Sequence, residues 1–275
     1  ALIQGCPSDI ARSVSTDSRR VSSEDLFVAL KGDRFDAHEF LDQVASQSAA
    51  AVLVHSLVSA TESFSGGVIH VSDTLRALQK IAFHYRRSLD EIRVIGVTGS
   101  NGKTSTKDLL EKVLSARGQV NKTAGNLNNH IGLPLTILSA GEQDRFGVWE
   151  MGMNHPGEIE VLAEIAAPEV AVVTHVGTAH IEHMKTREAI AAEKAELPMA
   201  LSQSGYCAMP VSDDFYEFVS ERVACDMLPV GIEEGAVQAR DLQLDETGRA
   251  SFQLVSDFGP ETSVILPVRG RHMVL

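Results

Sequence analysis

The chain has 275 residues, a formal net charge of −13 and a hydrophobic content of 44%. This length predicts about two domains, and the acidic balance argues against nucleic acid as a partner. No run of about 18 apolar residues occurs, so no membrane span is expected. No basic region followed by an apolar stretch opens the chain, so no signal peptide is expected either. The three cysteines (Cys6, Cys207 and Cys225) lack metal-ligand spacing, which favours reduced thiols in a cytoplasmic protein.

Residues 1–90 have the pattern of a small α/β domain. Apolar residues at helical spacing after His38 predict one helix. A second helix is expected over Thr74–Ser88, because Asp73 precedes it in a plausible capping sequence. Short apolar runs predict strands at Leu26–Leu30, Ala49–Val54 and Gly67–Val71.

Residues 91–275 are predicted to form a second domain. From Val94 to about Gly205, apolar strands alternate with helical stretches, which is typical of a doubly wound, mainly parallel sheet. After Tyr206 the pattern changes to alternating apolar and polar residues. This change predicts antiparallel strands at the edge of the sheet, at Val237–Leu244, Ala250–Val255 and Thr262–Val268.

The most informative segment is VIGVTGSNGKTS, which begins at Val94. A strand, a glycine-containing turn and a helix follow one another there, which is the setting of a phosphate-binding loop. The strict G-x-x-x-x-G-K-[ST] pattern is not met, because Val97 stands where the first glycine would be. The setting still predicts a nucleoside triphosphate site with Mg²⁺, formed by Gly99, Ser100, Asn101, Gly102, Lys103, Thr104 and Ser105.

Two further strand ends carry polar side chains. Glu150 ends the apolar run FGVWE, where it is either a magnesium-binding carboxylate or a solvated loop residue. His175, His180 and His183 follow another strand, and a functional role is expected for at least one of them.

Two other segments are ambiguous from the residues alone. Lys194 lies in a helical stretch, where a solvated lysine is the ordinary expectation. The Asn- and Gly-rich segment Thr123–Thr136 offers amide groups to a ligand, although turn formation explains most such clusters.

Taken together, these motifs resemble the Mur ligase family. The stretches TGSNGKT, GNLNNHIGLPLT, EMGMNHPGEI, TAHIE and AEKAE follow that family's motifs in order, and TDSRRVSSEDLFVALKGDRFDAHEF resembles its uridine-nucleotide-binding domain. The resemblance is strongest to the branch that adds D-alanyl-D-alanine. The branch that adds the third amino acid ranks second, and a P-loop nucleotide-binding module or kinase without ligase activity is an alternative of another class.

The resemblance implies an ATP-dependent amide ligase of peptidoglycan precursor synthesis. Its substrates would be ATP, UDP-N-acetylmuramoyl-tripeptide and D-alanyl-D-alanine, joined through an acyl phosphate, and the protein is expected to be a monomer.

The resemblance also implies roles for individual residues. Thr104, Glu150 and His180 would organise Mg²⁺, and Lys103, Lys194 and His180 would act in catalysis, with Lys194 carbamylated. Asn126 and Asn129 would join the nucleotide site, and Asp17, Ser18 and Arg19 would bind the UDP-sugar.

Two features depart from the family pattern. His175 occupies a place where relatives often have asparagine. The sequence given also ends at RGRHMVL, where the family continues into a third domain. We therefore expect that domain to be absent and the catalytic site of these residues to be incomplete.

Overall fold

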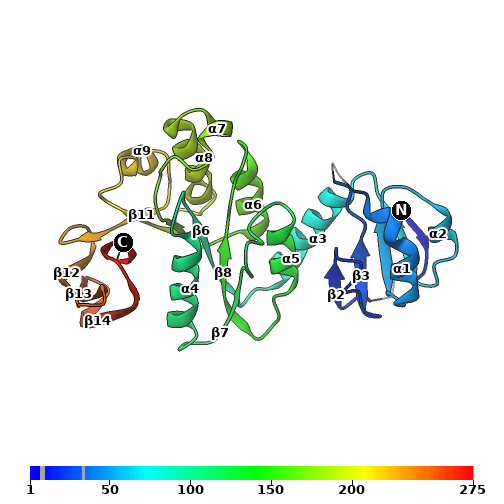
Figure 1. The fold of residues 1–275 in the computed structure, drawn as a ribbon, viewed down its shortest axis with the longest axis horizontal. Coiled ribbons are helices and arrows are strands. Elements are labelled where there is room, and N and C mark those ends of the chain that lie inside the picture. The colour runs from blue at the N-terminus through cyan, green and yellow to red at the C-terminus, as the bar shows by residue number, and fades with distance from the viewer. Residues whose placement is uncertain (7–9, 33–34, 275) are drawn as a thin grey trace. The chain divides into compact units, whose positions relative to one another are not determined.

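A computed structural model describes residues 1–6, 10–32 and 35–274 (Figure 1). The chain forms two compact units, the first made of residues 1–89 and 134–140 and the second of residues 90–133 and 141–275. Each unit is built on a mainly parallel sheet with helices, which confirms the predicted α/β class. Within the described residues, no helix is both long enough and apolar enough to cross a membrane.

The first unit contains a five-stranded sheet in the order β1-β5-β4-β3-β2. β2 to β5 run parallel, and β1 pairs antiparallel with β5. The strands are β1 (Leu2–Gln4), β2 (Ser13–Ser15), β3 (Asp25–Val28), β4 (Ala51–Val54) and β5 (Gly67–His70). The helices are η1 (Ala37–Phe40), α1 (Leu41–Ser46), α2 (Ser59–Glu62) and α3 (Thr74–Ser88).

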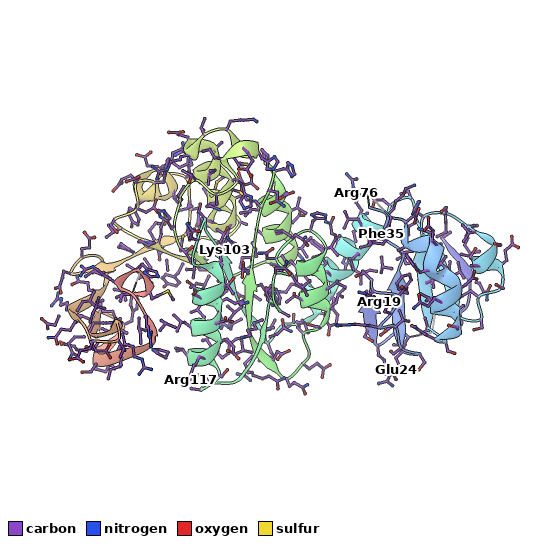
Figure 2. All side chains as sticks on the ribbon, viewed as in Figure 1. Arg19, Glu24, Phe35, Arg76, Lys103 and Arg117 are labelled. Atoms are coloured by element: carbon purple, nitrogen blue, oxygen red, sulfur yellow. The ribbon has the colours of Figure 1, made fainter. Side chains whose placement is uncertain are left out.

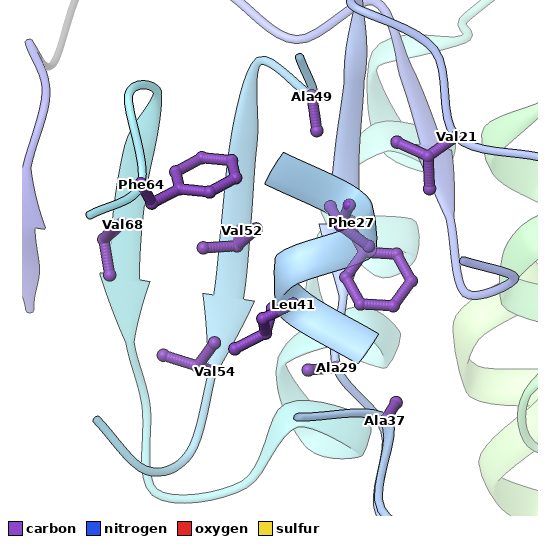
Figure 3. Packing of buried hydrophobic residues seen from close by; sticks show 11 residues of the cluster. Val21, Phe27, Ala29, Ala37, Leu41, Ala49, Val52, Val54, Phe64 and Val68 are labelled. Atoms are coloured by element: carbon purple, nitrogen blue, oxygen red, sulfur yellow. The ribbon is translucent and has the colours of Figure 1, made fainter. Parts of the chain in front are cut away.

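The core of the first unit forms where α1 covers the sheet. Leu41 of α1 packs with Phe27 of β3 and Val52 of β4, and all three are almost fully buried (Figure 3). Burial of each such side chain stabilises the fold by about 1.5–3 kcal/mol. The predicted helix over Thr74–Ser88 is confirmed as α3, where the side chain of Asp73 accepts a hydrogen bond from Arg76 N at 2.9 Å.

The second unit contains a nine-stranded sheet in the order β14-β13-β12-β11-β10-β9-β6-β8-β7. Its strands are β6 (Arg93–Thr98), β7 (Gln119–Lys122), β8 (Asp144–Glu150), β9 (Val170–Val173), β10 (Tyr206–Pro210), β11 (Asp226–Ile232), β12 (Val237–Leu244), β13 (Arg249–Ser256) and β14 (Gly259–Arg269). The remaining helices of the chain are α4 (Lys103–Leu114), α5 (Gly132–Leu138), α6 (Glu158–Ala166), α7 (Ile181–Met184), α8 (Arg187–Met199), α9 (Tyr216–Ser220) and η2 (Arg271–Met273).

The strand order reverses around β6. The chain passes from β6 outward to β7 and back to β8, and it then crosses to β9 on the other side of β6. α4 packs against β6, β7 and β8, whereas α6 and α8 pack against each other (Figure 1). In such sheets, ligands bind beyond the carboxyl ends of the strands at the point of reversal. The segment after β6 is therefore the favoured position for a site.

The parallel part of the sheet extends further than the sequence predicts. β10 and β11 continue it, and β12 also pairs parallel with β11, with Val230 opposite Val237. Between these two strands, Glu233 and Gly235 adopt positive φ angles of 62° and 88°. The predicted antiparallel edge is confirmed from β12 onward, through its pairing with β13 and that of β13 with β14.

Candidate functional site

The loop between β6 and α4 has the backbone of a phosphate-binding turn. Gly99 has a φ of 149°, and a Cβ atom added to it would lie 1.9 Å from Thr174 Oγ1. Gly102 has a φ of 84° and is the N-cap residue of α4. The positive φ angles favour glycine at both positions, and at Gly99 a side chain would also collide with Thr174. The loop therefore presents the N-terminus of a 12-residue helix, whose free N–H groups attract anions.

Lys103 lies at the start of α4 (Figure 2). Its Nζ donates a hydrogen bond to Gly99 O at 2.7 Å. Burial lowers the pKa of Lys103, and the negative charge of Glu150 opposes that shift. The ammonium group is thus held at the loop, within the reach of a bound phosphate.

Glu150 is the polar centre of the site and is only 2% exposed. One of its carboxylate oxygens accepts a hydrogen bond from Thr104 Oγ1 at 3.0 Å, and the other accepts one from Asn128 Nδ2 at 2.8 Å. These hard oxygen donors suit Mg²⁺, which is usually bound through one or two carboxylates together with substrate phosphates. Thr104 and Glu150 therefore fit the proposed magnesium site.

Lys107 is a buried cation beside this centre, and the sequence analysis did not single it out. Its Nζ donates to Thr123 O at 2.9 Å and lies 4.0 Å from Glu150 Oε2. It follows Thr104 by three positions and Lys103 by four, so all three share one face of α4. That spacing is the signal by which Lys107 could have been found.

Lys194 lies in α8 and is 2% exposed, so the expectation of a solvated lysine is wrong. Burial, followed by the positive charge of Lys103, lowers its pKa to about 7. Its neighbour Glu193 accepts hydrogen bonds from the backbone N–H groups of Gly157 and Ile159 at 2.7 and 2.8 Å. Glu193 therefore ties the segment that contains Lys194 to the start of α6.

The three histidines after β9 lie in different surroundings. His175 Nδ1 lies 2.8 Å from Asp213 Oδ2, and the backbone of His175 contacts the phosphate loop. His180 has a positive φ of 64° and precedes α7. His183 packs against the ring of His155. In the described part of the chain, no hydrogen bond or ion pair links the His180 side chain to Glu150, so its metal role stays a prediction.

The Asn-rich segment supplies a different contact from the one predicted. Asn129 Oδ1 accepts hydrogen bonds from Ile131 N and Gly132 N at 3.1 and 2.8 Å, so this oxygen is engaged by the backbone at the start of α5. Asn126 is exposed, and Asn128 is the member of this segment that binds Glu150. The nucleotide contacts of Asn126 and Asn129 stay predictions.

Asp17 and Arg19 form a fork-shaped pair after β2. Arg19 Nε and Nη2 donate to the two carboxylate oxygens of Asp17, both at 2.8 Å, and these bonds lower the pKa of Asp17 to about 2. Ser18 Oγ lies 3.4 Å from Gln43 Oε1. The Arg19 side chain is 80% exposed, so its remaining donors face solvent. The pair stands at the carboxyl end of a parallel strand, where ligands commonly bind.

Asp36, His38 and His55 also lie close together in the first unit, with ligand atoms within 4.8 Å of one another. However, His38 Nδ1 bonds to Asp36 Oδ1 at 2.6 Å, and His38 Nε2 accepts from His55 N at 3.1 Å. Since both ring nitrogens of His38 are occupied, this cluster does not favour a metal site.

The fold of the second unit defines a P-loop α/β protein, with the loop between β6 and α4 at the point where the strand order reverses. Comparison with known families gives a match to the Mur ligase middle domain over residues 97–275. The chain belongs to the Mur ligase family, as the sequence motifs predict.

Individual relatives agree with this assignment. The chain is 39% identical to the UDP-N-acetylmuramoyl-tripeptide--D-alanyl-D-alanine ligase of Bacillus subtilis over 268 residues, which cover 97% of this chain and 56% of the relative. The structure of this chain is similar to that of MurF from Acinetobacter baumannii, with a TM-score of 0.89 and 35% identity. The match covers 95% of this chain and 56% of that one.

A MurF ligase from Thermotoga maritima, solved in complex with ADP, gives a TM-score of 0.82 and 32% identity, and covers 94% of this chain and 59% of that one. The chain thus spans between half and two thirds of the length of these relatives.

Proposed function

We propose that this protein is an ATP-dependent ligase that joins D-alanyl-D-alanine to UDP-N-acetylmuramoyl-tripeptide in peptidoglycan precursor synthesis. The names of its relatives support this substrate pair, and a relative solved with ADP supports the nucleotide. The observation that carries the proposal is the contact of Thr104 with Glu150 beside the phosphate loop, because it joins a hydroxyl and a carboxylate where Mg²⁺ would meet phosphate.

The proposed reaction has two steps, which preserve all atoms. The terminal carboxylate of the tripeptide attacks the γ-phosphorus of ATP, and ADP leaves. The amine of D-alanyl-D-alanine then attacks the acyl phosphate carbon, and phosphate and one proton of the amine leave as the amide forms. Lys103 and the N–H groups of the loop would stabilise negative charge on the transferred phosphoryl group. Mg²⁺, held by Thr104 and Glu150, would supply further neutralisation of phosphate charge.

We also propose that Lys194 is carbamylated in the working site. Carbamylation requires the neutral amine, which adds to CO₂ and releases one proton. A pKa of about 7 gives Lys194 a substantial neutral fraction at physiological pH. The product is an anion, so the positive charge of Lys103, which disfavours a charged Lys194, would instead attract it. These properties make Lys194 suited to the modification.

We assign the UDP-sugar end of the substrate to the first unit. Asp17, Ser18 and Arg19 follow the carboxyl end of β2 in a parallel sheet. Arg19 retains exposed donors that suit an anionic oxygen. The domain boundary near residue 90 and the substrate role of this unit are both part of the proposal.

A phosphate-release assay of the complete natural protein tests the function against its alternatives. The ligase predicts release only when ATP, the UDP-tripeptide and D-alanyl-D-alanine are all present. A ligase that adds the third amino acid would instead require a UDP-dipeptide and a single amino acid. Transfer of phosphate to a stable product without any amine would indicate a kinase, and would contradict the proposal.

A further inference from the structure

The segment that follows β9 is bonded directly to the phosphate loop. Ser100 N donates to His175 O at 2.7 Å, and Thr174 Oγ1 donates to Asn101 O at 2.5 Å. Gly177 N donates to Ser100 Oγ at 2.9 Å. Because these bonds engage both backbone and side chain of the loop, the position of this segment constrains the conformation of residues 100 and 101.

A buried carboxylate also binds the same segment. Asp213 follows β10, and its side chain is only 1% exposed. Its Oδ2 accepts hydrogen bonds from His175 Nδ1 at 2.8 Å and Val176 N at 2.9 Å, and its Oδ1 accepts one from Phe215 N at 3.0 Å. A carboxylate can only accept, so the hydrogen of this imidazole stands on Nδ1.

We propose that His175 is a positioning residue of the nucleotide site, through which Asp213 fixes the phosphate loop at Ser100. The inference rests on the proposed nucleotide function and assigns a role to a residue whose function the sequence leaves open. Asp213 orients the imidazole, the imidazole orients its own backbone carbonyl, and that carbonyl holds Ser100 N. The pair thereby extends the site from the end of β6 to the end of β10.

The chemistry of this contact also specifies which substitution should be tolerated. His175 uses only the Nδ1–H group, which is bonded to Cγ. Asparagine carries an N–H donor, Nδ2, that is likewise bonded to Cγ, so it can reach the same carboxylate oxygen. Alanine keeps the backbone carbonyl and loses this donor.

A further set of hydrogen bonds, donated by Arg187, keeps this segment attached when the imidazole is removed. Arg187 Nη2 donates to Val176 O at 3.0 Å and to Asp214 Oδ2 at 2.8 Å. Because the hydrogen bonds of Arg187 do not involve His175, substitution of His175 should loosen the conformation of the phosphate loop without unfolding the second unit.

The test is calorimetric titration of Mg·ADP into the natural protein and its variants. We expect His175→Ala to weaken binding by roughly tenfold, because an oriented hydrogen bond to a carboxylate is lost. His175→Asn should remain within about twofold of the natural protein. His84→Ala, an exposed histidine of the first unit, is the matched control and should bind as the natural protein does.

Urea unfolding of the same variants separates positioning from stability. A merely structural role would lower the unfolding midpoint of His175→Ala and leave the affinity of the folded protein unchanged, which would overturn the inference. Equal weakening by His175→Ala and His175→Asn would also overturn it. Failure of the natural protein to bind Mg·ADP would remove the nucleotide function itself, and the inference with it.

Discussion

Thr104 Oγ1 lies 3.0 Å from Glu150 Oε2, although 46 positions separate the two residues in the chain. The contact exists because β6 and β8 are parallel neighbours whose carboxyl ends meet at one edge of the sheet. Thr104 lies in the first turn of the helix that follows one strand, and Glu150 ends the other strand. This arrangement places a hydroxyl and a carboxylate together beside the loop that would hold phosphate.

Replacement of Glu150 by glutamine should therefore damage metal use while preserving the fold. Glutamine keeps an oxygen that can accept from Thr104, but it removes the negative charge that attracts Mg²⁺. We expect a fall in turnover on the order of 100-fold, with partial recovery at high Mg²⁺ concentration. Steady-state rates across a Mg²⁺ series would measure it, with Glu246→Gln, in the exposed β12–β13 turn, as control. Unchanged turnover would remove Glu150 from the site.

Lys107→Met should destabilise the second unit by about 3 kcal/mol, because it leaves the buried carboxylate of Glu150 without its nearest cation. Urea unfolding of Lys107→Met, Glu150→Gln and the double variant would measure the coupling between the two residues. We expect the double variant to lose less unfolding free energy than the two single variants lose together. Strict additivity would show that the two side chains do not interact.

The stability of the protein should depend on Lys194 between pH 7 and pH 10.5. Its folded-state pKa of about 7 lies below the ordinary value of 10.5, so in this range the unfolded chain binds a proton that the folded chain does not. Lys194 thus contributes a rise in stability with pH of up to about 1.4 kcal/mol per unit, and loss of that stability as pH falls toward 7.

In Lys194→Met this contribution should disappear, and the variant should be more stable than the natural protein at pH 7. Urea unfolding in CO₂-free buffer at several pH values between 7 and 10.5 would measure the difference. Parallel pH profiles for the two proteins would contradict the depressed pKa of Lys194.

Carbamylation of Lys194 has its own spectroscopic test. With ¹³C-labelled bicarbonate, we expect a carbamate resonance in the natural protein that weakens when CO₂ is removed. Lys194→Met lacks the amine and should give no such signal at any bicarbonate concentration. The same carbamate signal in both proteins would assign the modification to another amine.

Arg19→Ala should weaken binding of the UDP-linked substrate by roughly tenfold and leave Mg·ADP affinity unchanged. Arg76→Ala is the matched control, because Arg76 is an exposed arginine of the same unit beside an aspartate, Asp73 (Figure 2). Calorimetric titration of each ligand would separate the two effects. Equal losses for both ligands in Arg19→Ala would indicate a folding defect instead of a lost contact.

The sequence predicts best where local signals agree. The helix over Thr74–Ser88 has a capping aspartate and a clear apolar face, and the turn at Gly99 and Gly102 is flanked by a strand and a helix. It predicts less well after Tyr206, because β10 and β11 contain Pro210 and Pro229, which are uncommon within the strands of a sheet.

Local sequence patterns do not predict contacts between segments that are far apart in the chain. Asn128 binding to Glu150, and Asp213 holding His175, depend on which strands are neighbours in the sheet. The burial of Lys194 was hidden for a related reason, since a lysine in a helix is ordinarily solvated until its packing is known. Only the motif resemblance indicated a role for it.

In the proposed reaction, ATP activates the carboxylate of the peptide as an acyl phosphate. This activation can be followed with UDP-tripeptide labelled with ¹⁸O in its terminal carboxylate, in the presence of ATP, Mg²⁺ and D-alanyl-D-alanine. One ¹⁸O atom should pass from that carboxylate into each phosphate released, as mass spectrometry would show. Release of unlabelled phosphate alongside amide formation would contradict it.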